Sequence, residues 1–237
     1  MFLSDSIMFG FADPWPVLGA IAARTERVRL GTWITPVPQL QPWRLAHAVA
    51  ALDRLSEGRV IFGAGMGVES EHEQYGDPYE RAKMGRKYDE ALEIMTRLWA
   101  GEEVTFDGEF FTLDGVTLPV GPVQQPRVPV VTAAWWPNRK AFQRAAGSDG
   151  IMPAWPAMLG DAEGPEGQRS TGASVEEELE ELLGYYHGIT DAPGEIIVAR
   201  PERECPEFDE VAEQHGVTWQ LAAYDLDEAE IRRGPPR

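Results

Sequence analysis

Cysteine is almost absent from this 237-residue sequence, which contains only Cys205. A single cysteine cannot close an internal disulfide and cannot supply a metal cluster. Long apolar runs are missing too, so we expect no transmembrane helix. The first ten residues lack a basic segment, and Asp5 falls where the apolar part of a signal peptide would lie. We therefore expect a cytoplasmic protein without a cleaved signal peptide.

Positive charge is also scarce, because 21 Lys and Arg residues face 39 Asp and Glu residues, for a formal net charge of −18. Such a surface repels the phosphates of nucleic acids and the headgroups of anionic membranes, so we expect neither as a partner. An anionic ligand would need a locally basic pocket within this negative field. Basic residues beside a helix start are therefore of interest.

Expected strands and helices alternate along the chain, and nothing divides residues 1–237 into more than one domain. The apolar patterns predict strands at 28–34, 59–63, 128–133, 149–153, 195–199 and 217–222, with helices between them. Residues 102–118 are predicted to form a hairpin turned at Asp107 and Gly108. This order predicts a parallel sheet of about seven right-handed βα units, close to an eight-stranded TIM-type barrel. A doubly wound open sheet is the alternative, although no G-x-G-x-x-G motif follows the first strand.

Five segments together resemble one known family, the luciferase-like flavin-dependent oxidoreductases. They are RTERVRLGTWITP at 24–36, PWRLAHAVAALDRLSEGRVIFGAGMG at 42–67, KYDEALEIMTRLWAGEEVTFDGEFFTLDGVTL at 87–118, PVQQPRVPVV at 122–131 and WWPNRKAFQRAAGSDGIMP at 135–153. The resemblance implies a (β/α)8 barrel that binds FMN or coenzyme F-420 at the carboxyl ends of its strands. Residues 2–7 resemble the family's second strand, so the family's first strand and helix are expected to be missing.

The resemblance also implies where the cofactor binds. Asp5 is expected at the edge of the isoalloxazine ring, with Thr35 and Ala134 at the ends of two later strands. The histidine that usually follows the family's aspartate is Ser6 here, which puts its acid–base role in doubt. Asp5 is thus one candidate for catalysis, and a loop carboxylate is the alternative interpretation.

Gly63, Gly65 and Gly67 end the strand over 59–63, and small residues allow a ligand to approach the backbone closely. No Gly-Lys-Ser/Thr sequence follows, so this is not a Walker loop. The next residues, Glu69, His72 and Glu73, superficially resemble a metal site. One histidine and two acids on a loop are more often solvated, so we expect no metal. His72 remains a weak candidate for substrate contact.

Asn138 and Arg139 begin the helix that follows strand 128–133. A helix start presents free N–H groups and positive potential, and arginine adds a bidentate donor for phosphate. This segment is a candidate anchor for the phosphate of FMN or F-420. A surface loop whose two tryptophans pack internally is the alternative.

The sequence therefore predicts a flavin-dependent oxidoreductase acting on a small organic substrate. It would use either reduced FMN with oxygen, as a monooxygenase, or F-420 with hydride transfer. The alternative is a non-catalytic flavin-binding or degenerate paralogue of the family. A barrel that lacks one strand has two unpaired edges, so we expect either a homodimer that covers the gap or family-like sequence upstream.

Overall fold

The computed structural model describes residues 1–7, 12–76, 79–159, 172–201 and 206–222. Within these ranges no helix has both the length and the apolar character needed to cross a membrane. The sequence over 160–173 is rich in Gly, Glu and Ser and predicts a mobile loop, and residues 225–237 predict a polar tail. Apart from residues 172 and 173, both segments lie outside the described residues.

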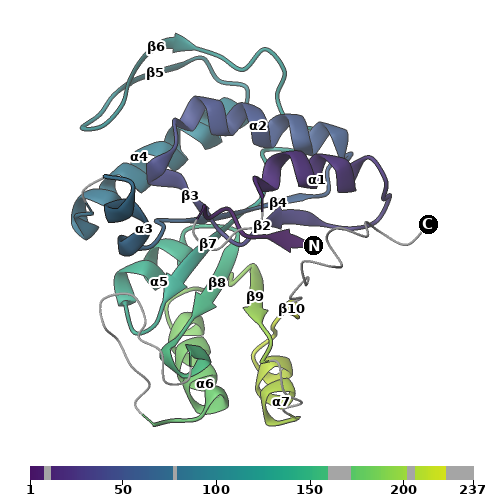
Figure 1. The fold of residues 1–237 in the computed structure, drawn as a ribbon, viewed down its shortest axis with the longest axis vertical. Helices are drawn as coiled ribbons and strands as arrows, with labels where there is room; N and C mark the ends of the chain where they lie inside the picture. The colour runs from purple at the N-terminus through teal and green to yellow at the C-terminus, as the bar shows by residue number, and fades with distance from the viewer. Residues whose placement is uncertain (8–11, 77–78, 160–171, 202–205, 223–237) are drawn as a thin grey trace.

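One parallel sheet organises the molecule, with the strand order β1-β2-β4-β7-β8-β9-β10 (Figure 1). Its members are β1 (Phe2–Leu3), β2 (Leu30–Thr32), β3 (Thr35–Pro36), β4 (Val60–Gly65), β7 (Val130–Trp135), β8 (Gly150–Ala154), β9 (Glu195–Ala199) and β10 (Trp219–Leu221). The short strand β3 lies outside this order and pairs with β4. The spatial order follows the chain order without reversal, which excludes the doubly wound alternative. The sheet curls but does not close into a complete barrel. In the described part of the chain, β1 and β10 form its two edges and do not pair with each other.

Helices cover the outside of this sheet, and a hairpin lies beyond them. In Figure 1, α1, α2 and α4 lie above the early strands and α6 and α7 lie below the later ones. The helices are α1 (Pro14–Ala22), α2 (Pro42–Leu55), α3 (Glu69–Gln74), α4 (Arg81–Trp99), α5 (Arg139–Ala146), α6 (Val175–His187) and α7 (Pro206–Gln214), with short 3-10 turns η1 (Val37–Gln39) and η2 (Pro156–Leu159). Strands β5 (Val104–Asp107) and β6 (Thr112–Val116) form the predicted antiparallel hairpin.

Local sequence explains where the first helices begin. Asp13 accepts a hydrogen bond from the backbone N–H of Trp15 at 3.0 Å, and Pro14 occupies the first turn of α1, where no intrahelical donor is needed. Pro42 begins α2 in the same way. Helix α4 buries a stripe that includes Tyr88 and Trp99, in agreement with the predicted apolar spacing.

Apolar side chains fill both sides of the sheet, as a parallel sheet covered by helices requires. Inside the curl, Ile61, Val131, Met152 and Ile197 come from four neighbouring strands and form one buried cluster. Side chains of both edge strands, β1 and β10, pack against this cluster. Two larger clusters lie outside the sheet, under α1, α2 and α4 and under α5, α6 and α7.

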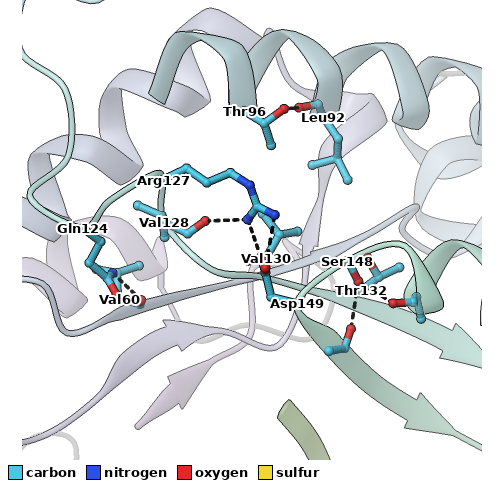
Figure 2. Close-up of polar contacts among 12 residues, drawn as sticks. Val60, Leu92, Thr96, Gln124, Arg127, Val128, Val130, Thr132, Ser148 and Asp149 are labelled. Atoms are coloured by element: carbon cyan, nitrogen blue, oxygen red, sulfur yellow. Dashed lines mark hydrogen bonds and ion pairs between the residues drawn. The ribbon is translucent and has the colours of Figure 1, made fainter. Parts of the chain in front are cut away.

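Polar contacts join the strands at their amino ends. Asp149, just before β8, forms an ion pair with Arg127, just before β7, and accepts a hydrogen bond from the N–H of Val130 at 2.7 Å (Figure 2). The Arg127 guanidinium also donates to the carbonyl of Val128 at 3.2 Å. The groups at this edge satisfy one another, so they serve stability, and the carboxyl ends are the place to look for a site.

Two local predictions are wrong. The strand expected over 28–34 is shorter in the structure and ends at Thr32. Thr35 and Pro36, which were expected to terminate that strand, form a separate short strand that pairs with β4. Residues 69–74 form helix α3 rather than a loop. Acids in the first turn and His72 in the last turn match the helix dipole, which favours this short helix.

Candidate functional site

A chain of polar side chains lies at the carboxyl ends of the first strands. The Thr35 hydroxyl, on β3, is 2.7 Å from Asp5 Oδ2, just beyond β1. The same hydroxyl is 2.9 Å from the Thr32 hydroxyl at the end of β2. Thr32 in turn reaches the carbonyl oxygen of Gly63 on β4 at 3.0 Å. Four strands therefore contribute to one hydrogen-bonded group, although their residues are far apart in the sequence.

Asp5 is a half-buried carboxyl group in an acidic neighbourhood. Burial raises its pKa above the ordinary value, and the nearby carboxylates of Asp13 and Glu71 act in the same direction. Hydrogen bonds from Thr35 and from the Trp15 side chain oppose this effect but do not reverse it. A carboxyl group with a raised pKa at the carboxyl edge of a parallel sheet is suited to hold or donate a proton.

Glu71, on α3, is a site residue that sequence reasoning missed. Its side chain is buried, and its two oxygens accept hydrogen bonds from the Ser6 hydroxyl at 3.0 Å and the Ile7 N–H at 2.8 Å. These contacts attach the segment that carries Asp5 to α3. Glu71 stands in the acidic sequence ESEHEQ, which resembles a solvated surface, so no local signal distinguishes it from its neighbours.

His72 is fully buried, and its contact with substrate remains a prediction. Its Nε2 is 2.9 Å from the carbonyl oxygen of Met66, and its ring lies 4.9 Å from the ring of Tyr79. No group of three or more His, Cys, Asp or Glu side chains in the described ranges could hold a metal ion.

Gly65 and Gly67 are required by the protein's own packing. A Cβ on Gly65 would lie 1.8 Å from Ile34 Cδ1, and a Cβ on Gly67 would lie 2.9 Å from His72 Nε2. Gly67 also has a φ of +79°, a backbone conformation that favours glycine. The expected close approach of a ligand remains a prediction, whereas close approach of neighbouring side chains is what the structure shows.

A second group of candidate residues lies on β7 and at the start of α5. Ala134 is buried in the strand, and Arg139 is exposed, with its guanidinium 4.3 Å from the Tyr185 ring and 5.4 Å from the Trp136 ring. Asn138 stands at the N-cap, but its side chain caps no backbone N–H. The N–H of Ala141, the third residue of α5, bonds to the Asn138 carbonyl at 3.0 Å, whereas the first two N–H groups of a helix in general lack a partner within it.

Trp135 adds an unusual donor to this second group. Its Nε1 is buried and has no hydrogen-bond partner in the described part of the chain. Buried donors are nearly always paired, so an unpaired one at the end of a strand marks a place where a ligand acceptor could bind. Together with the start of α5, this donor fits a cofactor that carries a phosphate.

The structure thus brings Asp5, Thr35, Gly65, Gly67 and His72 together around the ends of β1, β3 and β4. Ala134, Asn138 and Arg139 form the second group on the neighbouring strand. The two groups are adjacent, because a Cβ on Gly65 would lie 3.4 Å from the Cβ of Ala133.

Comparison with known proteins gives a consistent result. A family model described as luciferase-like monooxygenase matches residues 2–181. F420-dependent glucose-6-phosphate dehydrogenase of Beutenbergia cavernae is 40% identical over 121 residues, which cover 50% of this chain and 34% of the relative. Limonene 1,2-monooxygenase of Rhodococcus erythropolis is 38% identical over 113 residues, which cover 47% of this chain and 28% of the relative.

A solved structure supports the same relationship. The monooxygenase RslO1 from Streptomyces bottropensis superposes with a TM-score of 0.64 and 26% identity, covering 86% of this chain and 59% of that chain. The chain spans about half the length, or less, of the curated relatives that it matches.

Proposed function

The chain belongs to the luciferase-like monooxygenase family, and from this premise we propose that it is an oxidoreductase that binds FMN or coenzyme F-420. Relatives of both kinds match it, an F420-dependent dehydrogenase and monooxygenases. The proposed substrate is a small organic molecule, oxidised by hydride transfer to F-420 or oxygenated with reduced FMN.

One observation carries the proposal: the two candidate groups lie side by side at the carboxyl edge of the sheet. One group offers a protonatable carboxyl, Asp5, hydrogen-bonded to Thr35 at 2.7 Å. The other offers an unpaired side-chain donor, Trp135 Nε1, and the start of α5, where a helix presents positive potential. A flavin or deazaflavin nucleotide needs both kinds of contact, one at its ring and one at its phosphate.

In this proposal the cofactor supplies the redox chemistry, and the protein binds, orients and protects it. Asp5 and Thr35 would meet the polar edge of the ring. Arg139 and the start of α5 would hold the phosphate, and Trp135 would donate a further hydrogen bond. The net negative charge of the molecule repels a phosphate, so the positive charge of Arg139 is important for binding it.

The test is a fluorescence titration of the Arg139→Glu variant with FMN and with F-420. A charge-assisted hydrogen bond contributes about 1.5–3 kcal/mol, and about 1.4 kcal/mol corresponds to a tenfold change in affinity. We expect more than about tenfold weaker binding of either cofactor. Riboflavin lacks the phosphate, so its weaker binding is expected to change little.

A matched control separates the phosphate contact from net charge. Arg24→Glu makes the same change in charge at an exposed position just after α1, which lies before the amino end of β2. This control is expected to bind both cofactors like the unmodified protein, and melting curves check that all variants fold. Equal losses of FMN and riboflavin binding in Arg139→Glu would contradict the phosphate site, as would unchanged binding of all ligands.

A further inference from the structure

The two threonines beside Asp5 pose a simple counting problem. Three oxygen–oxygen contacts run in series: Asp5 to Thr35 at 2.7 Å, Thr35 to Thr32 at 2.9 Å, and Thr32 to the Gly63 carbonyl at 3.0 Å. Each contact needs one hydrogen atom. Each threonine hydroxyl supplies only one, and the carbonyl supplies none. The two hydroxyls therefore cannot make all three hydrogen bonds by themselves.

A proton on Asp5 supplies the missing hydrogen. With Asp5 neutral, its carboxyl O–H donates to Thr35, Thr35 donates to Thr32, and Thr32 donates to Gly63, so all three contacts are hydrogen bonds. With Asp5 ionised, Thr35 must donate to the carboxylate, and the single hydrogen of Thr32 can serve only one of its two partners. One contact is then lost at a place where both threonine side chains are buried and water cannot replace it.

We propose that Thr32 and Thr35 are positioning residues whose hydrogen bonds favour the protonated form of the Asp5 carboxyl over the carboxylate at the ligand-facing edge of the sheet. Thr35 acts in both protonation states, because it accepts from the acid and donates to the carboxylate. Thr32 acts only through Thr35, by providing the acceptor that turns the Thr35 hydroxyl away from Asp5. In this arrangement the Asp5 carboxyl carries the proton, and the two threonine hydroxyls stabilise it there by hydrogen bonds.

The surrounding charges agree with this assignment. The charged groups that act on Asp5 are the carboxylates of Asp13, at the start of α1, and Glu71, on α3. Both are acidic and disfavour a further negative charge. The hydrogen-bonding neighbours of Asp5 are Trp15, from α1, and Thr35, from β3.

The consequence for the ligand rests on the proposed function. A reduced flavin or deazaflavin ring is rich in electrons, and a second negative charge beside it would repel it. A neutral acid instead offers a hydrogen bond and a proton at the ring edge. The threonine pair would therefore favour the reduced, anionic form of the cofactor.

The experiment measures the pKa of the Asp5 carboxyl in the ligand-free protein by NMR with ¹³C-labelled aspartate. The signal is assigned by its loss in Asp5→Asn. In the unmodified protein we expect titration above the ordinary value of 3.8. Thr32→Val keeps the shape but removes the penalty on ionisation, so it is expected to lower the pKa by about half to one pH unit. Thr35→Val removes the only threonine donor to the carboxylate and is expected to raise the pKa.

Opposite shifts from two neighbouring, isosteric substitutions are the signature of this arrangement. If the two threonines were only structural, their valine variants would not shift the pKa of Asp5 in opposite directions. Thr32→Ser and Thr35→Ser keep the hydroxyls and are expected to keep the pKa near that of the unmodified protein. Shifts in the same direction, or an unchanged pKa in Thr32→Val, would overturn the proposal.

Titration of Asp5 at or below 3.8 in the unmodified protein would also overturn it, even if a valine variant does not fold. The measurement needs no cofactor. An ordinary pKa for Asp5 would thus leave the phosphate test at Arg139 intact. A failure of cofactor binding would leave the Asp5 result intact.

Discussion

At the scale of single residues, the properties of the site come from neighbours that are distant in sequence. Burial raises the pKa of Asp5, and the carboxylates of Asp13 and Glu71 act in the same direction. Glu71 binds the backbone N–H of Ile7 and the hydroxyl of Ser6, and in this way fixes the segment that carries Asp5. Ser6 therefore has a defined structural contact with α3.

The raised pKa of Asp5 predicts a specific dependence of stability on pH. Between the unfolded value near 3.8 and the higher folded value, the folded state binds more protons than the unfolded state. The free energy of unfolding contributed by Asp5 is therefore greatest below this window and falls as pH rises through it. Asp5→Asn keeps a donor for Thr35 but cannot ionise. Its stability relative to the unmodified protein is expected to rise with pH across the window.

Urea unfolding at a series of pH values checks this, and only the difference between the two proteins is interpreted, because other groups titrate in both. Asp191→Asn is a suitable control, since it removes an exposed carboxylate just before the amino end of β9, at the edge of the sheet opposite to that of Asp5. A stability difference that falls as pH rises would show that Asp5 is preferentially ionised in the folded state.

At the scale of elements, the stability of a helix depends in part on the hydrogen bonds at its ends. Helix α6 begins with a capping box in which the Ser174 hydroxyl accepts from the Glu177 N–H at 3.1 Å and the Glu177 carboxylate accepts from the Ser174 N–H at 2.8 Å. This helix covers β8 and η2, where its Glu178 side chain accepts from the N–H of Ala157 at 2.8 Å. The cap thus supports the later half of the sheet.

Removing the cap is expected to destabilise the fold measurably. Ser174→Ala removes the side-chain acceptor of the box and should cost about 1 kcal/mol, or roughly 2–4 °C in melting temperature for a chain of this size. Ser174→Asp retains an acceptor and adds a favourable charge at the helix start, so it should melt close to the unmodified protein. Differential scanning calorimetry measures both. Equal melting of all three proteins would mean that the box contributes nothing to stability.

At the scale of the whole molecule, two features act against each other. In the described residues β1 and β10 each pair on one side only, and the apolar cluster inside the curl reaches both edges. Unpaired edges beside apolar surface favour association. The net charge of −18 opposes it by repulsion between copies.

We therefore expect a homodimer whose stability rises with ionic strength, because salt screens the repulsion but not the apolar contact. Size-exclusion chromatography with light scattering should give twice the chain mass of 26.3 kDa, with more dimer at higher salt. A single species of 26.3 kDa at every salt concentration would refute the expectation.

The sequence alone determined most of the architecture. The apolar runs and helix starts gave the alternation of strands and helices, because these patterns depend on local geometry and burial. They predicted the hairpin over 102–118 and the helices that separate the later strands. The residues that resemble the luciferase-like family predicted the barrel and its carboxyl-edge site. Short elements such as α3 and β3 were missed, since their formation depends on contacts that local propensity does not contain.

Only the tertiary structure decided what the site residues do. It placed Thr35 next to Asp5 and Glu71 next to Ile7, across separations of 30 and 64 residues. It also assigned Gly65 and Gly67 to internal packing and directed Arg139 onto the rings of Trp136 and Tyr185. Hydrogen-bond partners, burial and the resulting pKa depend on which strand ends meet, and the sheet establishes that only when it folds.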